Sequence, residues 1–337
     1  MNKKIITIFA IVAIIVVVAG IPLALISGYG GDSDASEPIA DSELPDEITV
    51  DYANWSYLSL VLRDQKFLEE EFSKDNVKVN WVLSQGGPYA MQFLGSGSVD
   101  IATAAGVCGL MSYSNGINVK GVYALNTHPN EIMVGANSDI NELEDLRGKS
   151  IAAPIGTDPY IFLLRALATV GLTKNDVNII PLQSQEGLQS FFQGDIDAMA
   201  TGGPGGPVAK IKANARTMYS SVELSTPNFL FVRQEFYEKY PEAVLTVMAA
   251  YEKSRAWAKE HPEEYIALII RESKMNDELT RLVLKDDHID SGEITDAQLR
   301  SVAGTEAALK QIGILRKDHD VQKTVDELFD KSLFHKL

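Results

Sequence analysis

The chain has 337 residues, of which 45% are apolar and 23% are charged, and its formal net charge is −16. This length allows two domains of about 100–200 residues each, and the composition allows packed cores. The charge argues against nucleic-acid binding, because contacts with phosphates need clustered Lys and Arg. The single cysteine, Cys108, excludes an intramolecular disulfide, and its neighbours Val107 and Leu110 indicate a buried small hydrophobic side chain.

The N-terminal part of the chain is typical of a membrane segment followed by a linker. Two lysines precede the apolar run Ile5–Ile26, which would span about 33 Å as a helix, enough for the roughly 30 Å hydrocarbon core. A secretory signal has a shorter apolar region, so we expect a retained anchor at residues 1–27, with a cleaved signal as the alternative. Residues 28–47 are rich in Gly, Ser, Asp and Glu, which indicates a flexible acidic linker. The lysines predict that the rest of the chain lies on the extracytoplasmic face of the membrane.

Short strands and helices alternate between residues 48 and 232. From alternating or continuous apolar residues we expect strands at 48–53, 77–83, 99–103, 119–125, 132–136, 150–153, 177–182, 196–200, 217–221 and 229–232. In this region we expect four helices: one at 58–72, one that ends near 94, one that begins at about 158 and one that ends near 192. From residue 241 the chain is almost entirely helical, with helices expected at 241–260, 262–273, 276–286, 295–312 and 321–334. This alternation implies an α/β protein with mostly parallel sheets that helices cover on both faces.

The stretch Leu146–Leu172 combines a charged turn, a short strand, a polar loop and a helix. Asp158 suits the N-cap of this helix and Pro159 its first position, while Gly171 suits its C-terminal end. Free backbone N–H groups and the positive end of the helix dipole at such a start favour an anionic ligand. We therefore expect the loop Gly156–Pro159 to face a binding site.

Two segments of the chain repeat each other. Gly97–Gly106 (GSVDIATAAG) matches Gly194–Gly203 (GDIDAMATGG), and each follows a predicted strand that ends in Ser-Gln, at Ser84-Gln85 and Ser184-Gln185. Such turns are common in α/β proteins, so chance similarity is the alternative, but the paired Ser-Gln favours a structural repeat. Two similar lobes with loops at the carboxyl ends of their strands would form a ligand cleft.

Several short motifs occur together in an order that resembles a known family. They are Leu94–Ala102 (LGSGSVDIA), Leu146–Gly156 (LRGKSIAAPIG), Gly171-Leu172 with Asp176-Val177, Gly194–Ala198 (GDIDA), and in the tail Phe236–Pro241, Trp257–Pro262 and Gln311–Leu315. In this order they resemble the extracytoplasmic solute-binding proteins of ABC transporters for nitrate, sulfonates and taurine. That group includes relatives that bind thiamine pyrimidine precursors. The resemblance covers about residues 48–334.

The resemblance implies a two-lobe, hinge-bending α/β fold of the periplasmic-binding-protein type II, with a helical C-terminal tail on lobe one. Lobe one would comprise residues 48–137 and 227–337, and lobe two residues 138–226, with hinges near 136–138 and 225–228. It also implies a monomeric importer component without a cofactor. Such a component binds a solute without chemistry and works with a membrane permease and an ATPase.

The candidate ligand-binding residues lie in loops that follow predicted strands. In lobe one they are Asn54, Trp55, Tyr57, Gln85, Gly86, Gly87, Ala105 and Gly106. In lobe two they are Thr157, Asp158, Gln185, Thr201, Gly202 and Gly203. Packing at the edge of the core is the alternative role for the aromatic residues, and a helix cap is the alternative for Asp158.

The charges near these loops constrain the ligand. None of the cleft loops carries Lys or Arg, so a bare anion such as nitrate fits poorly. An aliphatic sulfonate such as taurine fits better, with its ammonium group near Asp158 or Glu186 and its sulfonate on N–H and hydroxyl donors. A neutral or cationic organic ligand held by aromatic residues, such as a pyrimidine, is the alternative.

Two other function classes remain as rivals. An enzyme is disfavoured, because four of the five histidines lie in the predicted helical tail, and the chain shows no nucleophile motif or metal-ligand spacing. The glycine-rich segment Gly202–Gly206 lacks the following Lys of a phosphate-binding loop. A membrane-tethered sensor domain is the second rival, and it would need a signalling partner chain.

Overall fold

The computed structural model describes residues 44–337. The expected anchor at residues 1–27 lies outside the described residues, as does most of the expected linker. Within the described part of the chain, no helix combines the length and the apolar character needed to cross a membrane.

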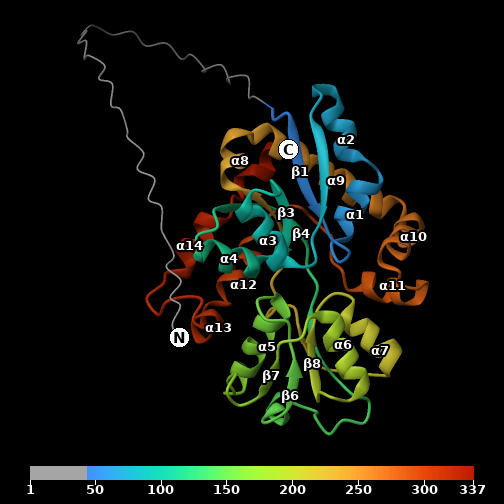
Figure 1. Cartoon of the computed structure of the whole chain (residues 1–337), viewed down its shortest axis with the longest axis vertical. Coiled ribbons are helices and arrows are strands. Elements are labelled where there is room, and N and C mark those ends of the chain that lie inside the picture. The colour runs from blue at the N-terminus through green and yellow to red at the C-terminus, as the bar shows by residue number, and fades with distance from the viewer. Residues whose placement is uncertain (1–43) are drawn as a thin grey trace, which may run out of the picture. The chain divides into compact units, whose positions relative to one another are not determined.

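The described chain forms two five-stranded sheets (Figure 1). The first has the order β2-β1-β3-β10-β4 and consists of β1 (Glu47–Tyr52), β2 (Lys78–Leu83), β3 (Ile101–Ala105), β4 (Val119–Asn126) and β10 (Asn228–Arg233). The second has the order β7-β6-β8-β5-β9 and consists of β5 (Asn130–Val134), β6 (Ser150–Ala152), β7 (Asn178–Ile180), β8 (Ala198–Thr201) and β9 (Arg216–Ser221). We call the sheets with their covering helices lobe one and lobe two.

The two-lobe α/β fold is confirmed, but both sheets are mixed rather than mostly parallel. In lobe one, β1 runs parallel to β2 and β3, whereas β10 runs antiparallel to β3 and β4. In lobe two, β6 runs parallel to β7 and β8, whereas β5 runs antiparallel to β8 and β9. The cause is the connectivity, because β5 and β10 each follow a strand of the other sheet and so enter their own sheet in the opposite direction.

The helices largely follow the sequence pattern. They are α1 (Tyr57–Asp64), α2 (Phe67–Phe72), α3 (Gly87–Ser96), α4 (Gly106–Ser114), α5 (Asp158–Thr169), α6 (Ser184–Gln193), α7 (Gly205–Ala213), α8 (Gln234–Lys239), α9 (Pro241–Glu260), α10 (Pro262–Ser273), α11 (Asp277–Lys285), α12 (Asp296–Ala303), α13 (Glu306–Gln311) and α14 (Val321–Leu328). Short 3-10 turns occupy Ser73–Asp75, Leu143–Leu146 and Ser332–Lys336. The expected helix 58–72 is two helices, because Lys66 adopts a left-handed conformation with φ of 57°. The expected helix 295–312 is also two, separated at Gly304 and Thr305.

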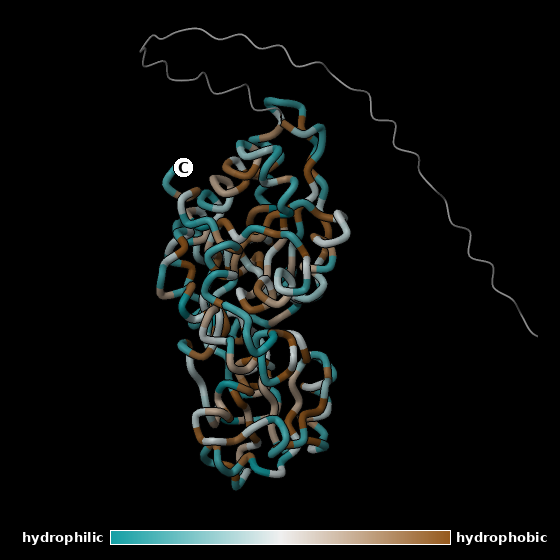
Figure 2. The backbone as a smooth tube through the Cα atoms, turned by 90° about the vertical axis from the view of Figure 1, so that its left-hand side faces the viewer, coloured by the Kyte–Doolittle hydropathy of each residue, from teal (hydrophilic) through white to brown (hydrophobic). Residues whose placement is uncertain are grey.

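Apolar side chains cover both faces of each sheet. In lobe one, α1, α9 and α10 pack on one face, and α3, α4 and α14 pack on the other. In lobe two, α5 covers one face through Ile132 and Ile151, while α6 and α7 cover the other through Met133 and Ala152. This alternation of neighbouring residues follows from the two-residue period of a strand. Figure 2 shows hydrophilic residues at the outer turns of the tube.

The internal repeat is present in the structure. Gly97 ends α3 and Gly194 ends α6, both in the left-handed conformation, with φ of 73° and 78°. The strand after each glycine, β3 or β8, occupies the centre of its sheet. Asp100 accepts a hydrogen bond from Thr49 N at 2.9 Å, and its counterpart Asp197 accepts one from Ser150 N at 2.7 Å. The two lobes are therefore versions of one βαβ unit.

The chain crosses between the sheets twice, at residues 127–129 and 222–227. The first crossing differs from the expected hinge near 136–138, since β5 belongs to the second sheet although we expected residues up to 137 in lobe one. The apolar run of β5 gave no sign of which sheet it would join. Tail helices also reach lobe two, because α13 packs against α5 and α11 packs against α7.

Candidate ligand-binding site

Loops from both lobes surround one hollow, which we call the cleft hollow. Its volume is about 20 Å³, and it is lined by Trp55, Tyr57, His128, Pro129, Glu131, Gly203, Pro207, Val283, Asp286 and Asp287. Trp55 and Tyr57 follow β1, Gly203 follows β8, and Asp286 and Asp287 follow α11. The hollow therefore lies where interior strands of both sheets end, which is where open α/β sheets bind ligands. Trp55, Tyr57 and Gly203 are residues that the sequence predicted.

Two hydrogen-bond donors of the cleft hollow have no partner in the described chain. The indole Nε1 of Trp55 and the hydroxyl of Tyr57 are both buried from solvent without a hydrogen bond. Tyr57 as a whole is only 3% exposed. A buried donor without a partner is costly, and a ligand with acceptor oxygens would satisfy it. This pair is the clearest sign of a polar ligand at the hollow.

One wall of the hollow, formed by Asp286 and Asp287, is acidic. Asp287 accepts a hydrogen bond from Asn126 Nδ2, and burial raises the pKa of its carboxyl to about 6. Asp286 is exposed. The backbone holds this wall in place, because Thr127 N donates to His288 O and His288 N donates to Thr127 O, both at 3.0 Å. Sequence reasoning missed the wall, since it lies more than two hundred residues from Trp55 and only the tail packing brings it there.

The remaining charged residues of the hollow are neutralised. Glu131 forms an ion pair with Lys210 Nζ at 2.7 Å and accepts a hydrogen bond from Thr217 Oγ1 at 2.7 Å. Burial lowers the pKa of His128 to about 4, so its ring is neutral at pH 7. The unneutralised charge at the hollow is therefore that of Asp286 and Asp287.

The starts of α3 and α5 meet across the two lobes. Cys108 Sγ on α4 lies 3.6 Å from Gly156 O, in the loop before α5. A Cβ atom on Gly87 would lie 2.8 Å from the same sulfur, so only glycine fits there. Cys108 is buried, as predicted, and burial raises the pKa of its thiol to about 12. The predicted loops Gln85–Gly87 and Gly156–Asp158 thus lie at the surface where the lobes touch.

Asp158 ties α5 to both crossings. Its buried carboxylate accepts hydrogen bonds from Asn130 Nδ2, from Thr226 N at 3.1 Å and from Thr226 Oγ1 at 2.7 Å. Its predicted role as N-cap was wrong, because Thr157 occupies that position and Asp158 is the first helical residue. The Thr157 hydroxyl donates to Pro154 O at 2.6 Å. With all these partners, the Asp158 carboxylate fastens α5 to the second crossing and to the start of β5, and it is not part of the lining of the hollow.

The other predicted residues are not in the lining of the hollow. Gly106 N donates to Pro227 O at 2.8 Å, and a side chain at Gly106 would clash with Val302 and Phe229. Ala105 pairs with Asn228 in the first sheet. Thr201 pairs with Glu131, and Gly202 lies against Asn130 and His128. Asn54 and Gln185 are exposed, and Glu186 caps its own helix by accepting from Gln183 N at 3.3 Å.

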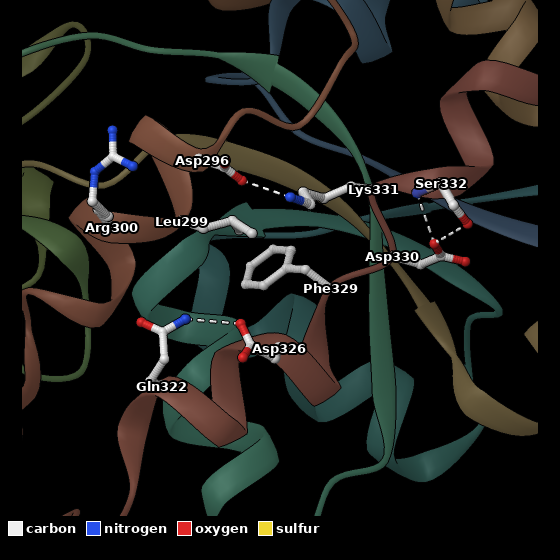
Figure 3. Close-up of a pocket in the computed structure, with 9 residues that line it drawn as sticks. All are labelled: Asp296, Leu299, Arg300, Gln322, Asp326, Phe329, Asp330, Lys331 and Ser332. Carbon is white, nitrogen blue, oxygen red and sulfur yellow. Dashed lines mark hydrogen bonds and ion pairs between the residues drawn. The ribbon is translucent and has the colours of Figure 1, made fainter.

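A larger hollow of about 460 Å³ lies between α12, α14 and the C-terminal segment (Figure 3). Six of its seven polar side chains bond to one another in pairs, and Arg300 is the exception. Lys331 Nζ lies 2.6 Å from Asp296, Gln322 Nε2 donates to Asp326 at 2.8 Å, and Ser332 Oγ donates to Asp330 at 2.6 Å. We place the candidate site at the cleft hollow, because loops of both lobes line it and its Trp55 and Tyr57 donors are buried without partners. Residues 44–337 contain no group of three His, Cys, Asp or Glu side chains that could hold a metal ion.

Known proteins resemble the chain in both sequence and structure. A protein of Bacillus subtilis (strain 168) that is named as an aliphatic sulfonates-binding protein is 30% identical over 280 residues, which cover 81% of this chain and 83% of that protein. The taurine-binding periplasmic protein of Escherichia coli (strain K12) is 26% identical over 182 residues, which cover 52% of this chain and 56% of that protein.

The solved structures agree with this fold. The alkanesulfonate-binding protein SsuA from Xanthomonas axonopodis pv. citri, bound to MOPS, superposes with a TM-score of 0.76 at 21% identity. The match covers 83% of this chain and 98% of that chain. The family described as NMT1/THI5 like matches residues 72–265, which is more than half of the sequence. The chain therefore belongs to the NMT1/THI5-like family.

Proposed function

We propose that the chain is the extracytoplasmic solute-binding component of an ABC importer and that it binds a small aliphatic sulfonate. The observation that carries this proposal is the cleft hollow, where the Trp55 and Tyr57 donors have no partner and loops of both lobes converge. A sulfonate offers three acceptor oxygens, which suit such donors. The names of the relatives from B. subtilis and E. coli support the same ligand class.

Binding would proceed by movement of the lobes about the two crossings. The cleft hollow has a volume of about 20 Å³, whereas ligand pockets generally measure about 300–1,000 Å³. The lobes must therefore part to admit a solute. Residues 127–129 and 222–227 are the hinge in this proposal, because they are the segments that join the sheets. A permease would then distinguish closed from open lobes and release the solute.

The cellular placement belongs to the same proposal. The apolar run Ile5–Ile26 would anchor the chain, and residues 28–47 would link it to the folded part on the extracytoplasmic face. The partners would be a permease and an ATPase in the same membrane. Binding without chemistry is the expected mode of action.

Calorimetry on the full-length chain in detergent tests this function. We expect saturable heat with taurine or ethanesulfonate and none with nitrate. We also expect Trp55→Ala to weaken sulfonate binding at least tenfold, because the substitution removes a hydrogen-bond donor and an aromatic wall. Trp257→Ala, in α9 and outside the cleft hollow, is the matched control. If an aminopyrimidine gives heat of binding and no sulfonate does, the ligand is a pyrimidine rather than a sulfonate. The absence of binding by any of these compounds would overturn the proposal.

A further inference from the structure

We propose that Asp286 and Asp287 hold a cationic group of the ligand, so that the site selects aminoalkanesulfonates over alkanesulfonates that lack an amine. This inference rests on the proposed sulfonate-binding function and adds a residue-level basis for specificity. Asp158 and Glu186, the acids that the sequence suggested for this role, have donors within the chain. The acids of the cleft hollow therefore take their place.

The balance of charge at the hollow supports an ammonium ligand. The lining contains three carboxylates and no Lys or Arg. Glu131 is neutralised by Lys210, whereas neither Asp286 nor Asp287 forms an ion pair within residues 44–337. Arg255 lies close enough to lower the pKa of Asp287, but its guanidinium donates to the carbonyl oxygens of Leu125, Ala124 and Ile289 and to the Tyr123 hydroxyl. An anion alone would meet uncompensated negative charge here.

The wall formed by Trp55 and Tyr57 supplies the complementary chemistry. The Trp55 Nε1–H and the Tyr57 O–H are buried without partners, and Tyr57 is nearly inaccessible to water. These donors suit sulfonate oxygens, while the indole ring also attracts a cation at its face. Burial raises the pKa of the Tyr57 hydroxyl, and the negative charge of Asp287 raises it further, so the two walls are near each other. A short zwitterion would satisfy both walls at once.

Backbone and side-chain hydrogen bonds hold the acidic wall in place. Asp286 and Asp287 follow the last turn of α11, and the paired backbone bonds between Thr127 and His288 fix them beside the first crossing. Asn126 donates to Asp287 Oδ1 and itself accepts from Asn228 Nδ2 at 2.9 Å. Because Asn228 begins β10, just after the second crossing, the wall is connected to both segments that join the lobes. Ammonium binding and closure of the lobes would therefore be coupled.

The test compares taurine with ethanesulfonate and 2-hydroxyethanesulfonate, which match its length but lack the amine. Calorimetry on the full-length chain should show at least tenfold tighter binding of taurine. Asp286→Asn together with Asp287→Asn should weaken taurine binding at least tenfold and leave ethanesulfonate binding unchanged or tighter. The control is Asp290→Asn, an exposed residue four positions further along and outside the hollow. Circular dichroism and thermal unfolding would confirm that each variant is folded.

The outcomes separate this inference from the function on which it rests. Equal binding of taurine and ethanesulfonate, unchanged in the double variant, would overturn the ammonium site and leave sulfonate binding intact. If the folded double variant loses affinity for taurine and ethanesulfonate to the same degree, the inference is also overturned, because the two aspartates then do not recognise the amine. The absence of binding by every sulfonate would overturn the proposed function itself.

Discussion

Two buried aspartates, Asp51 near the end of β1 and Asp158 at the start of α5, differ in how many hydrogen bonds their carboxylates accept. Asp158 accepts hydrogen bonds from Asn130 and from two donors of Thr226. Asp51 is completely buried, accepts from Thr103 N at 2.8 Å through Oδ1, and has no hydrogen-bond partner at Oδ2. Burial raises the pKa of Asp51 to about 7, although Ser84 and Thr103 act to lower it. Asp51 is therefore a group whose charged form opposes folding.

This difference predicts a pH-dependent stability for Asp51. Its folded pKa of about 7 lies above the ordinary aspartate value of 3.8, so the folded state binds the proton more tightly. Stability is thus greatest below the unfolded pKa and falls as the pH rises toward 7. Against the isosteric variant Asp51→Asn, the wild-type chain should lose on the order of 2 kcal/mol of unfolding free energy between pH 5 and pH 8.

Urea unfolding of both proteins at the two pH values measures this effect. Subtracting the unfolding free energy of the variant from that of the wild type removes the contributions of the other titrating groups, including Asp287. Asp51→Asn keeps an acceptor for Thr103 N, so both proteins should fold. A difference between wild type and variant that stays constant from pH 5 to pH 8 would mean that Asp51 does not change its charge state over this range.

At the scale of elements, Asp100 and Asp197 occupy equivalent positions just before β3 and β8, but we expect them to contribute unequally to the unfolding free energy. Asp100 accepts from Thr49 N and also pairs with Arg233 Nη2 at 2.7 Å. Asp197 accepts from Ser150 N and from Ser150 Oγ at 2.6 Å, but it is exposed. Because water competes at Asp197, we expect Asp100→Ala to lower the unfolding free energy by about 2 kcal/mol and Asp197→Ala by about 1 kcal/mol.

Chemical denaturation at pH 7 tests this order, with Asp195→Ala as the control. Asp195 is an exposed neighbour of the same loop, and only its backbone N–H is bonded, to Ser190 O at 3.0 Å. The control should therefore cost almost nothing. If Asp195→Ala and Asp197→Ala were equally stable, the hydrogen bonds to Ser150 would contribute nothing to the strand pair.

The elements that could be predicted from the sequence were those with a clear local pattern. The strands were predicted from alternating apolar residues. The repeat was predicted from matching segments that begin at Gly97 and Gly194, which end α3 and α6 in the left-handed conformation. Helices α4 and α7 escaped prediction because they begin in the glycine-rich segments at Gly106 and Gly205, which resemble loops. The direction of β5 depends on long-range pairing that no local pattern records.

The candidate site was predicted only in part for a similar physical reason. Residues directly after a strand, such as Trp55 and Gly203, can be assigned to the carboxyl edge from the strand alone. Asp286 and Asp287 reach the hollow through the packing of α11 against α7, far from any strand end in sequence. The roles of Asn130 and Thr226 depend on both crossings lying beside α5, which is a property of the whole fold.

At the scale of the whole molecule, Cys108 reports on the contact between the lobes. It is the only cysteine of the chain, and its sulfur lies 3.6 Å from Gly156 O of lobe two. It is 3% exposed in this closed arrangement, and burial raises the pKa of its thiol. When the lobes part, Gly156 and the nearby Asp158 must move away from it. The thiol should then become both more accessible and more reactive.

We therefore expect labelling of Cys108 by a disulfide reagent to be limited by opening of the lobes, and to slow at least fivefold when a saturating sulfonate holds them closed. Absorbance at the wavelength of the released thiolate follows the rate, and the urea-unfolded chain gives the rate for a free thiol. Cys108→Ala should give no signal, which controls for reagent hydrolysis. A labelling rate that is the same with and without a ligand whose binding calorimetry has established would mean that the lobes do not separate at the α4–α5 contact, and that solute enters without movement about residues 127–129 and 222–227.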